Sequence, residues 1–150
     1  MKLATALSER ADLQKRIVDL GNRLKMNAKV QDGEAPSEDP KVLLDELNKD
    51  FVRLEELMAR INHTNNVTKS GDVTLTDLIA KRDCLTERIK IMRTFLDSAS
   101  EKVTRYSKTE IKIKSTVPVS ELQKEVDKLS KELRETDETI QGINWTTELI

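Results

Sequence analysis

The sequence contains few of the residues from which β-proteins and disulfide frameworks are built. Among 150 residues there are 4 glycines, 3 prolines, 1 cysteine and 3% aromatic residues. A β-sandwich or barrel needs many turn residues and aromatic side chains, so the composition excludes both. The single cysteine, Cys84, cannot form an intrachain disulfide. Because this usage suits a reducing compartment, we expect a cytoplasmic protein.

Long apolar runs and an excess of one charge are also missing. No stretch approaches the ~20 apolar residues that cross a bilayer. Glu9 and Arg10 interrupt the N-terminal residues before the apolar core of a secretory signal could form. The 26 basic and 27 acidic residues give a net charge of −1, which provides no overall attraction to nucleic acid or anionic lipid. We expect neither a nucleic acid nor a membrane as partner.

Apolar residues recur at spacings of three and four in four blocks, which is typical of amphipathic helices. The blocks predict helices at about 2–29, 40–63, 75–107 and 120–141, with Asp39-Pro40 as a helix start and Gly142 as a stop. In the second block the predicted buried row is Leu44, Leu47, Phe51, Leu54, Met58 and Ile61. Such rows pack helix against helix at small crossing angles.

The connectors between these blocks predict the remaining structure. Ser70-Gly71-Asp72 stands between β-branched residues and is compatible with a small β-hairpin. Ile111 and Ile113 alternate with lysines and predict an extended arm. The predicted fold is therefore a single all-α domain over residues 1–150, an antiparallel bundle of four long helices with a small β-hairpin or extended arm at the connectors.

A second apolar row on the third helix predicts self-association. Cys84, Ile91 and Phe95 lie away from the main buried row of that helix, and a helix with two apolar faces has neighbours on two sides. We expect a homo-oligomer that uses this face, with Cys84 buried as a small apolar residue. The alternative is a monomer in which the first two helices cover both faces.

The residue types that carry chemistry do not form a recognisable site. His63 is the only histidine, and no carboxylate falls on the predicted apolar rows, so we expect no metal and no cofactor. Glu132, Glu135 and Glu138 have the spacing with which helical nucleotide pyrophosphatases hold magnesium, and this is the best enzymatic lead. The same spacing is also common on solvated helix faces. No catalytic residues are predicted.

Two further segments are candidates for contacts. The basic stretch 102–114 carries one aromatic residue, Tyr106, which favours a subunit or loop contact over nucleic-acid binding. Trp145 follows the predicted stop and is expected to fold back as an apolar anchor. Nearby amides at Asn62 and Asn65 are candidates to bond its indole or to cap the second helix.

Several strings together resemble small bacterial proteins of the septicolysin family. They are Asn27-Ala28-Lys29-Val30-Gln31, Glu38-Asp39-Pro40, Arg60-Ile61-Asn62, Arg105-Tyr106-Ser107, Glu110-Ile111-Lys112 and Asn144-Trp145-Thr146. The resemblance covers nearly the whole chain, and the family name implies a cytolysin. The candidate interaction or anchor residues lie in these strings or directly beside them: Asn62, His63, Asn65, Arg105, Tyr106, Glu110, Lys112, Asn144 and Trp145.

The sequence thus favours a non-catalytic structural or interaction protein that assembles with copies of itself, its protein partner being otherwise unknown. The resemblance implies one alternative, a membrane-active protein. The glutamates of the last helix imply another, a magnesium-dependent nucleotide-processing enzyme.

Overall fold

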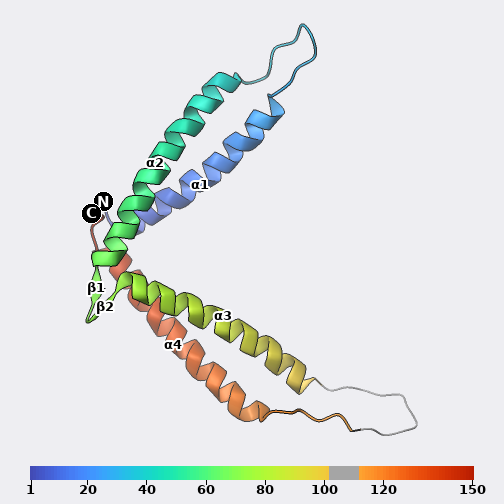
Figure 1. The fold of residues 1–150 in the computed structure, drawn as a ribbon, viewed down its shortest axis with the longest axis vertical. Helices are drawn as coiled ribbons and strands as arrows, with labels where there is room; N and C mark the ends of the chain where they lie inside the picture. Colours follow the sequence, from blue (N-terminus) through green and yellow to red (C-terminus); the bar gives the residue numbers. More distant parts are fainter. Residues whose placement is uncertain (102–111) are drawn as a thin grey trace. The chain divides into compact units, whose positions relative to one another are not determined.

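The structure is a computed structural model that describes residues 1–101 and 112–150. Four helices and one small sheet follow one another along the chain (Figure 1). The helices are α1 (Leu3–Met26), α2 (Pro40–Val67), α3 (Leu75–Ser100) and α4 (Val119–Thr146), and the strands are β1 (Lys69–Ser70) and β2 (Val73–Thr74). The prediction of four long helices with a small β-hairpin is confirmed.

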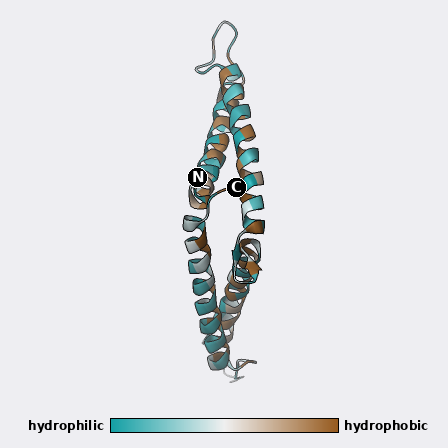
Figure 2. Ribbon diagram, turned by 90° about the vertical axis from the view of Figure 1, so that its left-hand side faces the viewer, coloured by the Kyte–Doolittle hydropathy of each residue, from teal (hydrophilic) through white to brown (hydrophobic). Residues whose placement is uncertain are grey.

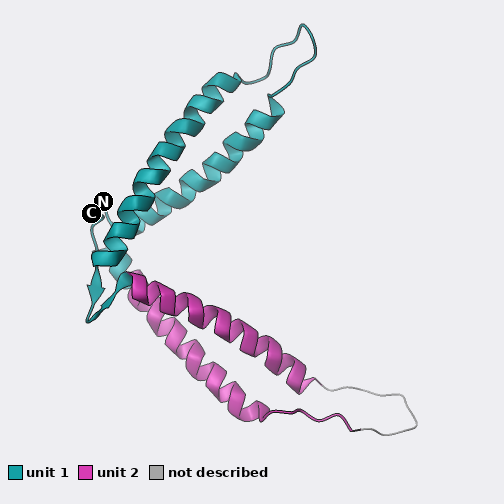
Figure 3. Ribbon diagram, viewed as in Figure 1, with its two compact units in different colours: residues 1–75, 142–150 teal, residues 76–141 magenta. Residues whose placement is uncertain are grey.

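The chain divides into two compact units (Figure 3). Unit 1 comprises Met1–Leu75 and Gly142–Ile150, and unit 2 comprises Thr76–Gln141. Unit 1 therefore contains α1, α2, the β-hairpin and the C-terminal end of α4. Unit 2 contains α3 from its second residue on and the longer part of α4.

The core of unit 1 is the seam between α1 and α2, which run antiparallel and side by side (Figure 1). Brown and teal residues alternate along the helices in Figure 2, as expected of amphipathic helices. The buried side chains of α1 are Leu3, Ala6, Leu13 and Leu20, and those of α2 are Leu43, Asp50, Leu57, Ile61 and Thr64. The α1 residues belong to the first apolar block of the sequence, whose further members Ile17 and Leu24 are half-buried.

The predicted buried row of α2 is half wrong. Leu47, Leu54 and Ile61 lie at the seam as expected, but Leu44, Phe51 and Met58 are exposed, by 47%, 50% and 44%. Leu43, Asp50 and Leu57 take their place, one residue earlier in each case. The reason is that α2 is apolar on both flanks of the Leu47–Leu54–Ile61 line, while α1 covers only one of those flanks.

Two helix ends in unit 1 differ from the prediction. α1 ends at Met26, because the Asn27 backbone N–H closes the last turn on the Arg23 carbonyl. α2 continues to Val67 rather than ending near His63. Its predicted start is correct: the Asp39 carboxylate accepts a 2.9 Å hydrogen bond from the Lys41 backbone N–H.

The β-hairpin follows α2 directly. Lys69 pairs with Thr74 and Ser70 with Val73, and Gly71 forms the turn with a φ of 62°, a value that side-chain-bearing residues rarely adopt. The Leu75 N–H donates a 2.8 Å bond to the Thr68 carbonyl, which extends the ladder to the start of α3. The part of the predicted extended arm that is described, residues 112–118, has no regular secondary structure.

Unit 2 is held together by one apolar cluster between α3 and α4. Its buried members are Leu85, Ile89, Leu96, Val126 and Leu129, which all belong to the predicted rows. α3 ends at Ser100, before the predicted end, and residues 102–111 lie outside the described part. α4 begins at Val119 and passes through Gly142 to Thr146. Gly142 is not a stop because it keeps helical backbone angles, unlike Gly33 and Gly71.

Candidate functional site

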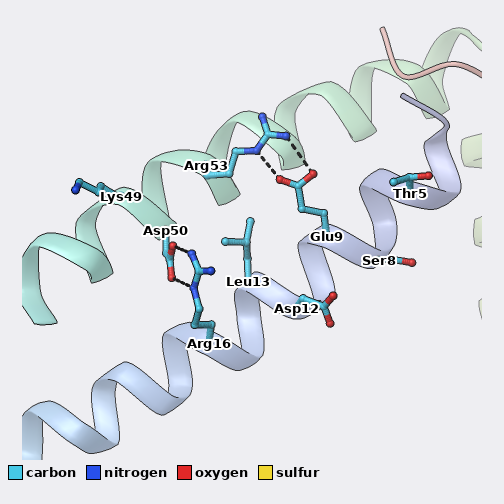
Figure 4. Close-up of a pocket in the computed structure, with 9 residues that line it drawn as sticks. All are labelled: Thr5, Ser8, Glu9, Asp12, Leu13, Arg16, Lys49, Asp50 and Arg53. Atoms are coloured by element: carbon cyan, nitrogen blue, oxygen red, sulfur yellow. Dashed lines mark hydrogen bonds and ion pairs between the residues drawn. The ribbon is translucent and has the colours of Figure 1, made fainter.

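A charged groove lies along one side of the α1–α2 hairpin (Figure 4). Its volume is about 710 Å³. Arg53 on α2 donates two hydrogen bonds, of 2.7 and 3.1 Å, to the carboxylate of Glu9 on α1. Arg16 on α1 grips Asp50 on α2 through Nε, at 2.5 Å, and through its second terminal nitrogen. The groove is thus lined by two bidentate ion pairs that join the helices.

Two of the three carboxylates that line the groove, Glu9 and Asp50, are held in their charged form. The hydrogen bond from Arg53 lowers the pKa of Glu9, and the hydrogen bond from Arg16 lowers the pKa of Asp50. A general acid or base needs a pKa near the working pH, so these shifts have the wrong direction for such a role. The groove is therefore a structural feature that fixes the register of the two helices.

Asp50 corrects one expectation drawn from the sequence. It lies on the buried row of α2 and is 4% exposed, so a carboxylate does occupy the seam. Since its charge is neutralised by Arg16 from the open edge of the groove, the seam tolerates it. No group of three or more potential metal ligands occurs in the described ranges.

A third ion pair closes the far end of the hairpin. Arg23 binds Glu38 through two nitrogens, at 3.0 Å for the Nε contact, which lowers the pKa of Glu38. The side chain of Asn27 donates to the Arg23 carbonyl and accepts from the Glu38 backbone N–H at 3.0 Å. Asn27 and Glu38 belong to the quoted strings, and their role here is to hold the 27–38 connector against α1.

The opposite side of the hairpin is apolar, and we call it the open face. It consists of Ile17, Leu24, Leu44, Leu47, Phe51, Leu54 and Met58, all half-buried or exposed. Arg10 lies in the same α1 row as Ile17 and Leu24, and its Nε is buried without a hydrogen-bond partner in the described part of the chain. None of the three ion pairs between the helices reaches this side.

The two chain termini meet at the other end of unit 1 (Figure 1). The Leu3 N–H donates to the Thr147 carbonyl at 2.9 Å, and the Leu149 N–H donates to the Met1 carbonyl at 2.8 Å. The Met1 amine and Lys2 both bind the Glu148 carboxylate, at 3.0 and 2.7 Å. This junction joins residues from the two ends of the chain in a short antiparallel contact.

α2 receives the last residue of the chain at the same junction. The buried hydroxyl of Thr64 accepts a 3.0 Å bond from the Ile150 N–H and donates one to the Arg60 carbonyl. Arg60 Nε donates to the Ile150 carbonyl at 3.1 Å. Sequence reasoning named the neighbours Asn62, His63 and Asn65 instead. Asn62 and His63 are exposed, and Asn65 is half-buried.

Trp145 is not the apolar anchor that the sequence predicts. Its side chain is 67% exposed, whereas Leu149 is buried. The reason is that α4 continues through Gly142, so Trp145 remains helical and projects from the outer side of the last turn. Its neighbour Asn144 is buried. A buried leucine four residues beyond a tryptophan gives no distinctive signal in the sequence.

In unit 2 the second row of α3 is exposed. Ile91 and Phe95 are 67% and 47% exposed, and Cys84 is also exposed rather than buried as predicted. Ile91 and Phe95 line a shallow depression of about 420 Å³ together with Glu87, Lys90, Thr94 and Ser98. α4 does not cover Cys84, because the Leu85–Ile89–Leu96 row occupies the side of α3 that it contacts.

The glutamates behind the enzymatic alternative are engaged elsewhere. Glu132 binds Lys81 at 2.8 Å, and Glu135 lies 3.8 Å from Lys131. The Lys81 contact lowers the pKa of Glu132. Arg82, in its heptad position, bonds Asp83 and lies 3.9 Å from Asp137. Glu132 and Glu135 therefore lie on a helix face where acidic side chains are close to basic ones.

The remaining candidate residues are Arg105, Tyr106, Glu110 and Lys112. Arg105, Tyr106 and Glu110 lie outside the described residues, and Lys112 is exposed. No helix of the described ranges is both long enough and apolar enough to cross a bilayer.

Comparisons with known proteins match almost the whole chain. A family model described as "Family of unknown function (DUF6847)" covers residues 10–149. A crystal structure of a functionally unknown conserved protein from Corynebacterium diphtheriae is 39% identical, with a TM-score of 0.93 over 100% of this chain and 99% of that one. No curated protein matches. Neither match supports the septicolysin resemblance, which is therefore corrected to membership of a family without a known activity.

Proposed function

Because the chain belongs to this family of unknown function, we propose a role from its own surfaces: a non-catalytic interaction protein that assembles with further copies of itself. One observation carries the proposal. In both units, exposed apolar side chains form rows at helical spacing, Leu44, Phe51 and Met58 on α2 and Ile91 and Phe95 on α3. Scattered apolar residues are normal on a protein surface, whereas continuous rows indicate a contact.

The alternatives lack such support. A nucleotide-processing enzyme would need a cluster of carboxylates to hold magnesium, whereas Glu132 pairs with Lys81, Glu135 lies 3.8 Å from Lys131, and the described residues contain no group of three potential metal ligands. The ion pairs of the charged groove use Glu9 and Asp50 to join the helices to each other, so neither of these two carboxylates is free for acid–base chemistry. We therefore assign the surfaces to binding. Nucleic acid is not the expected partner, because the rows are apolar and uncharged.

A reducing compartment fits the exposed thiol of Cys84. An accessible free cysteine would pair with other thiols in an oxidising compartment, where disulfides form and persist. We propose that the protein works in the cytoplasm.

Sedimentation of the full chain over a range of concentrations tests the proposal. We expect a mass above that of the 17.1 kDa chain, rising with concentration and changing little between low and high salt, since apolar contacts are not screened by ions. A monomer at every concentration would contradict it.

Two surfaces compete for the self-contact, the α3 row and the open face. The double variant Ile91→Glu/Phe95→Glu tests the α3 row, because both side chains are exposed and the fold does not depend on them. Thr86→Glu is its control, an exposed position on the same helix away from that row. Loss of the oligomer in the double variant alone would assign the contact to α3.

A further inference from the structure

The open face has the dimensions of a small interface. Leu44, Phe51 and Met58 follow one another at intervals of seven residues, so they form a line ~21 Å long at 1.5 Å per residue. Half-buried Ile17 and Leu24 widen the face to α1. Two helices with axes 8–10 Å apart present a width of ~19 Å, so each copy offers a footprint of ~400 Å². Burying this face on two copies removes roughly 800 Å² of accessible surface, the size of a weak or transient interface.

We propose that a second copy of this chain covers the open face, related by a two-fold axis that runs along the α1–α2 hairpin. This inference rests on the proposed function, because it names the surface and the geometry of the self-contact. Rotation about such an axis places α1 of one copy on α2 of the other at the same height. The result is a four-helix arrangement in which each α1 contacts one α2 within its chain and one across the interface.

The charges beside the open face favour this partner and this axis. Arg10 is half-buried on the α1 edge, with its Nε unsatisfied. Glu55 is exposed one helical turn after Phe51, on the α2 edge, and takes no part in the ion pairs of the described residues. The Glu9–Arg53 pair shows that Arg10 and Glu55 lie at similar heights on the two helices. Rotation about the long axis therefore brings Glu55 of the second copy over Arg10, twice per dimer.

The other two-fold arrangement is less favourable. A two-fold axis that crosses the hairpin at Ile17 would place α1 of one copy on α1 of the other, running in the opposite direction. A residue a given number of positions before Ile17 would then face the residue the same number of positions after Ile17 in the second copy. Arg10 would then lie against Leu24 and Lys25 of the second copy, so that two cations meet and the buried Nε remains unsatisfied. Like charges across an interface act against an arrangement.

Two sets of variants of the full chain test the inference: glutamine substitutions test the open face, and charge swaps test the two-fold axis. Phe51→Gln/Met58→Gln removes apolar contact at positions that are already half exposed. We expect the dissociation constant of the dimer, measured by sedimentation, to rise at least a hundredfold, since two apolar side chains are replaced by polar ones in each copy of a symmetric dimer. Val52→Gln is the matched control, because Val52 is 69% exposed next to Phe51 but on the other side of α2. It should leave dimerisation unchanged.

Arg10→Glu and Glu55→Arg should each weaken the dimer about tenfold or more, and the double variant Arg10→Glu/Glu55→Arg should restore it. Circular dichroism of each variant verifies that the helices are intact. A dimer that persists in folded Phe51→Gln/Met58→Gln overturns the inference while the proposed function stands. If the double variant Arg10→Glu/Glu55→Arg does not restore the dimer, the two-fold axis along the hairpin is wrong. A wild-type chain that stays monomeric overturns both proposals.

Discussion

Asp50 shows how a single ionised residue sets the packing of unit 1. Its carboxylate occupies a buried heptad position where leucine would be expected, between Leu43 and Leu57. Arg16 compensates the charge from the neighbouring helix and remains solvated itself, with its side chain 63% exposed. Because just one member of this ion pair is buried, the pair loses only part of its hydration, and it keeps a defined geometry. Together with Glu9–Arg53, it determines which flank of α2 faces α1.

The folded state should therefore lose stability in acid. Arg16 and Arg53 lower the pKa values of Asp50 and Glu9, so the unfolded chain binds more protons than the folded chain near the ordinary pKa of these groups. Their stabilisation is complete above about pH 4.5 and is lost as the pH falls through the lowered folded values. Chemical unfolding followed by circular dichroism between pH 7 and pH 2.5 measures this decline.

Asp50→Asn isolates the share of one pair in that decline. We expect it to lower the free energy of unfolding at pH 7 by about 1.5–3 kcal/mol, the range for a hydrogen bond to a charged group. We also expect a shallower dependence on pH, because the titrating carboxylate is gone. Asp45→Asn, on the exposed side of the same helix, should change neither quantity. Equal slopes in the wild type and Asp50→Asn would show that the pair is not formed.

At the scale of the helix, the sequence predicts existence and spacing better than orientation. The buried residues of α1 and α4 agree with the heptad spacing of the sequence, because each of these helices has one dominant apolar line, and in α3 the longer of its two apolar lines is the buried one. α2 has three adjacent lines, through Leu43, Leu47 and Leu44. Periodicity cannot decide which outer line is covered, since that depends on the Arg16–Asp50 pair between two helices. For this reason the sequence prediction places Leu44, Phe51 and Met58 of the open face in the core.

The end of α4 shows the same limit for a local signal. A glycine near the end of a periodic pattern predicts a stop only if the chain adopts a left-handed conformation there. Gly142 stays helical, and its neighbours Asn144 and Leu149 are buried in unit 1. The contacts that extend the helix come from the N-terminal residues Met1 and Leu3, more than 140 positions away.

Two glycine variants separate these conformations. Gly142→Ala should stabilise the protein by about 0.5–1 kcal/mol, because alanine has less backbone freedom to lose and the added Cβ meets no atom within 4 Å. Gly71→Ala should destabilise it by about 1 kcal/mol, because its φ of 62° is unfavourable for alanine. Thermal unfolding of both variants gives the two signs. A destabilising Gly142→Ala would mean that the helix does end there.

At the scale of the whole molecule, unit 1 depends on the last residues of the chain. The contacts of Thr147, Leu149 and Ile150 reach both the N-terminal residues and α2, so unit 1 joins two segments that are separated in the sequence by unit 2. Contacts this distant in sequence are invisible to local pattern reasoning. For this reason the sequence does not indicate which residues the C-terminal segment contacts.

This dependence predicts a local effect from a distant substitution. Leu149→Ala should lower the stability of unit 1 by about 2–4 kcal/mol, the cost of removing a buried leucine side chain. Trp145→Ala, which removes a larger side chain that is 67% exposed, should have an effect of less than about 1 kcal/mol. Hydrogen exchange resolves where stability is lost. In Leu149→Ala the amides of α1 and α2 should exchange faster while those at Leu85–Leu96 keep their protection, because that segment packs in a separate core. Equal loss of protection in both units would show that they unfold as one cooperative body, and the hairpins would then have to be treated as a single folding unit.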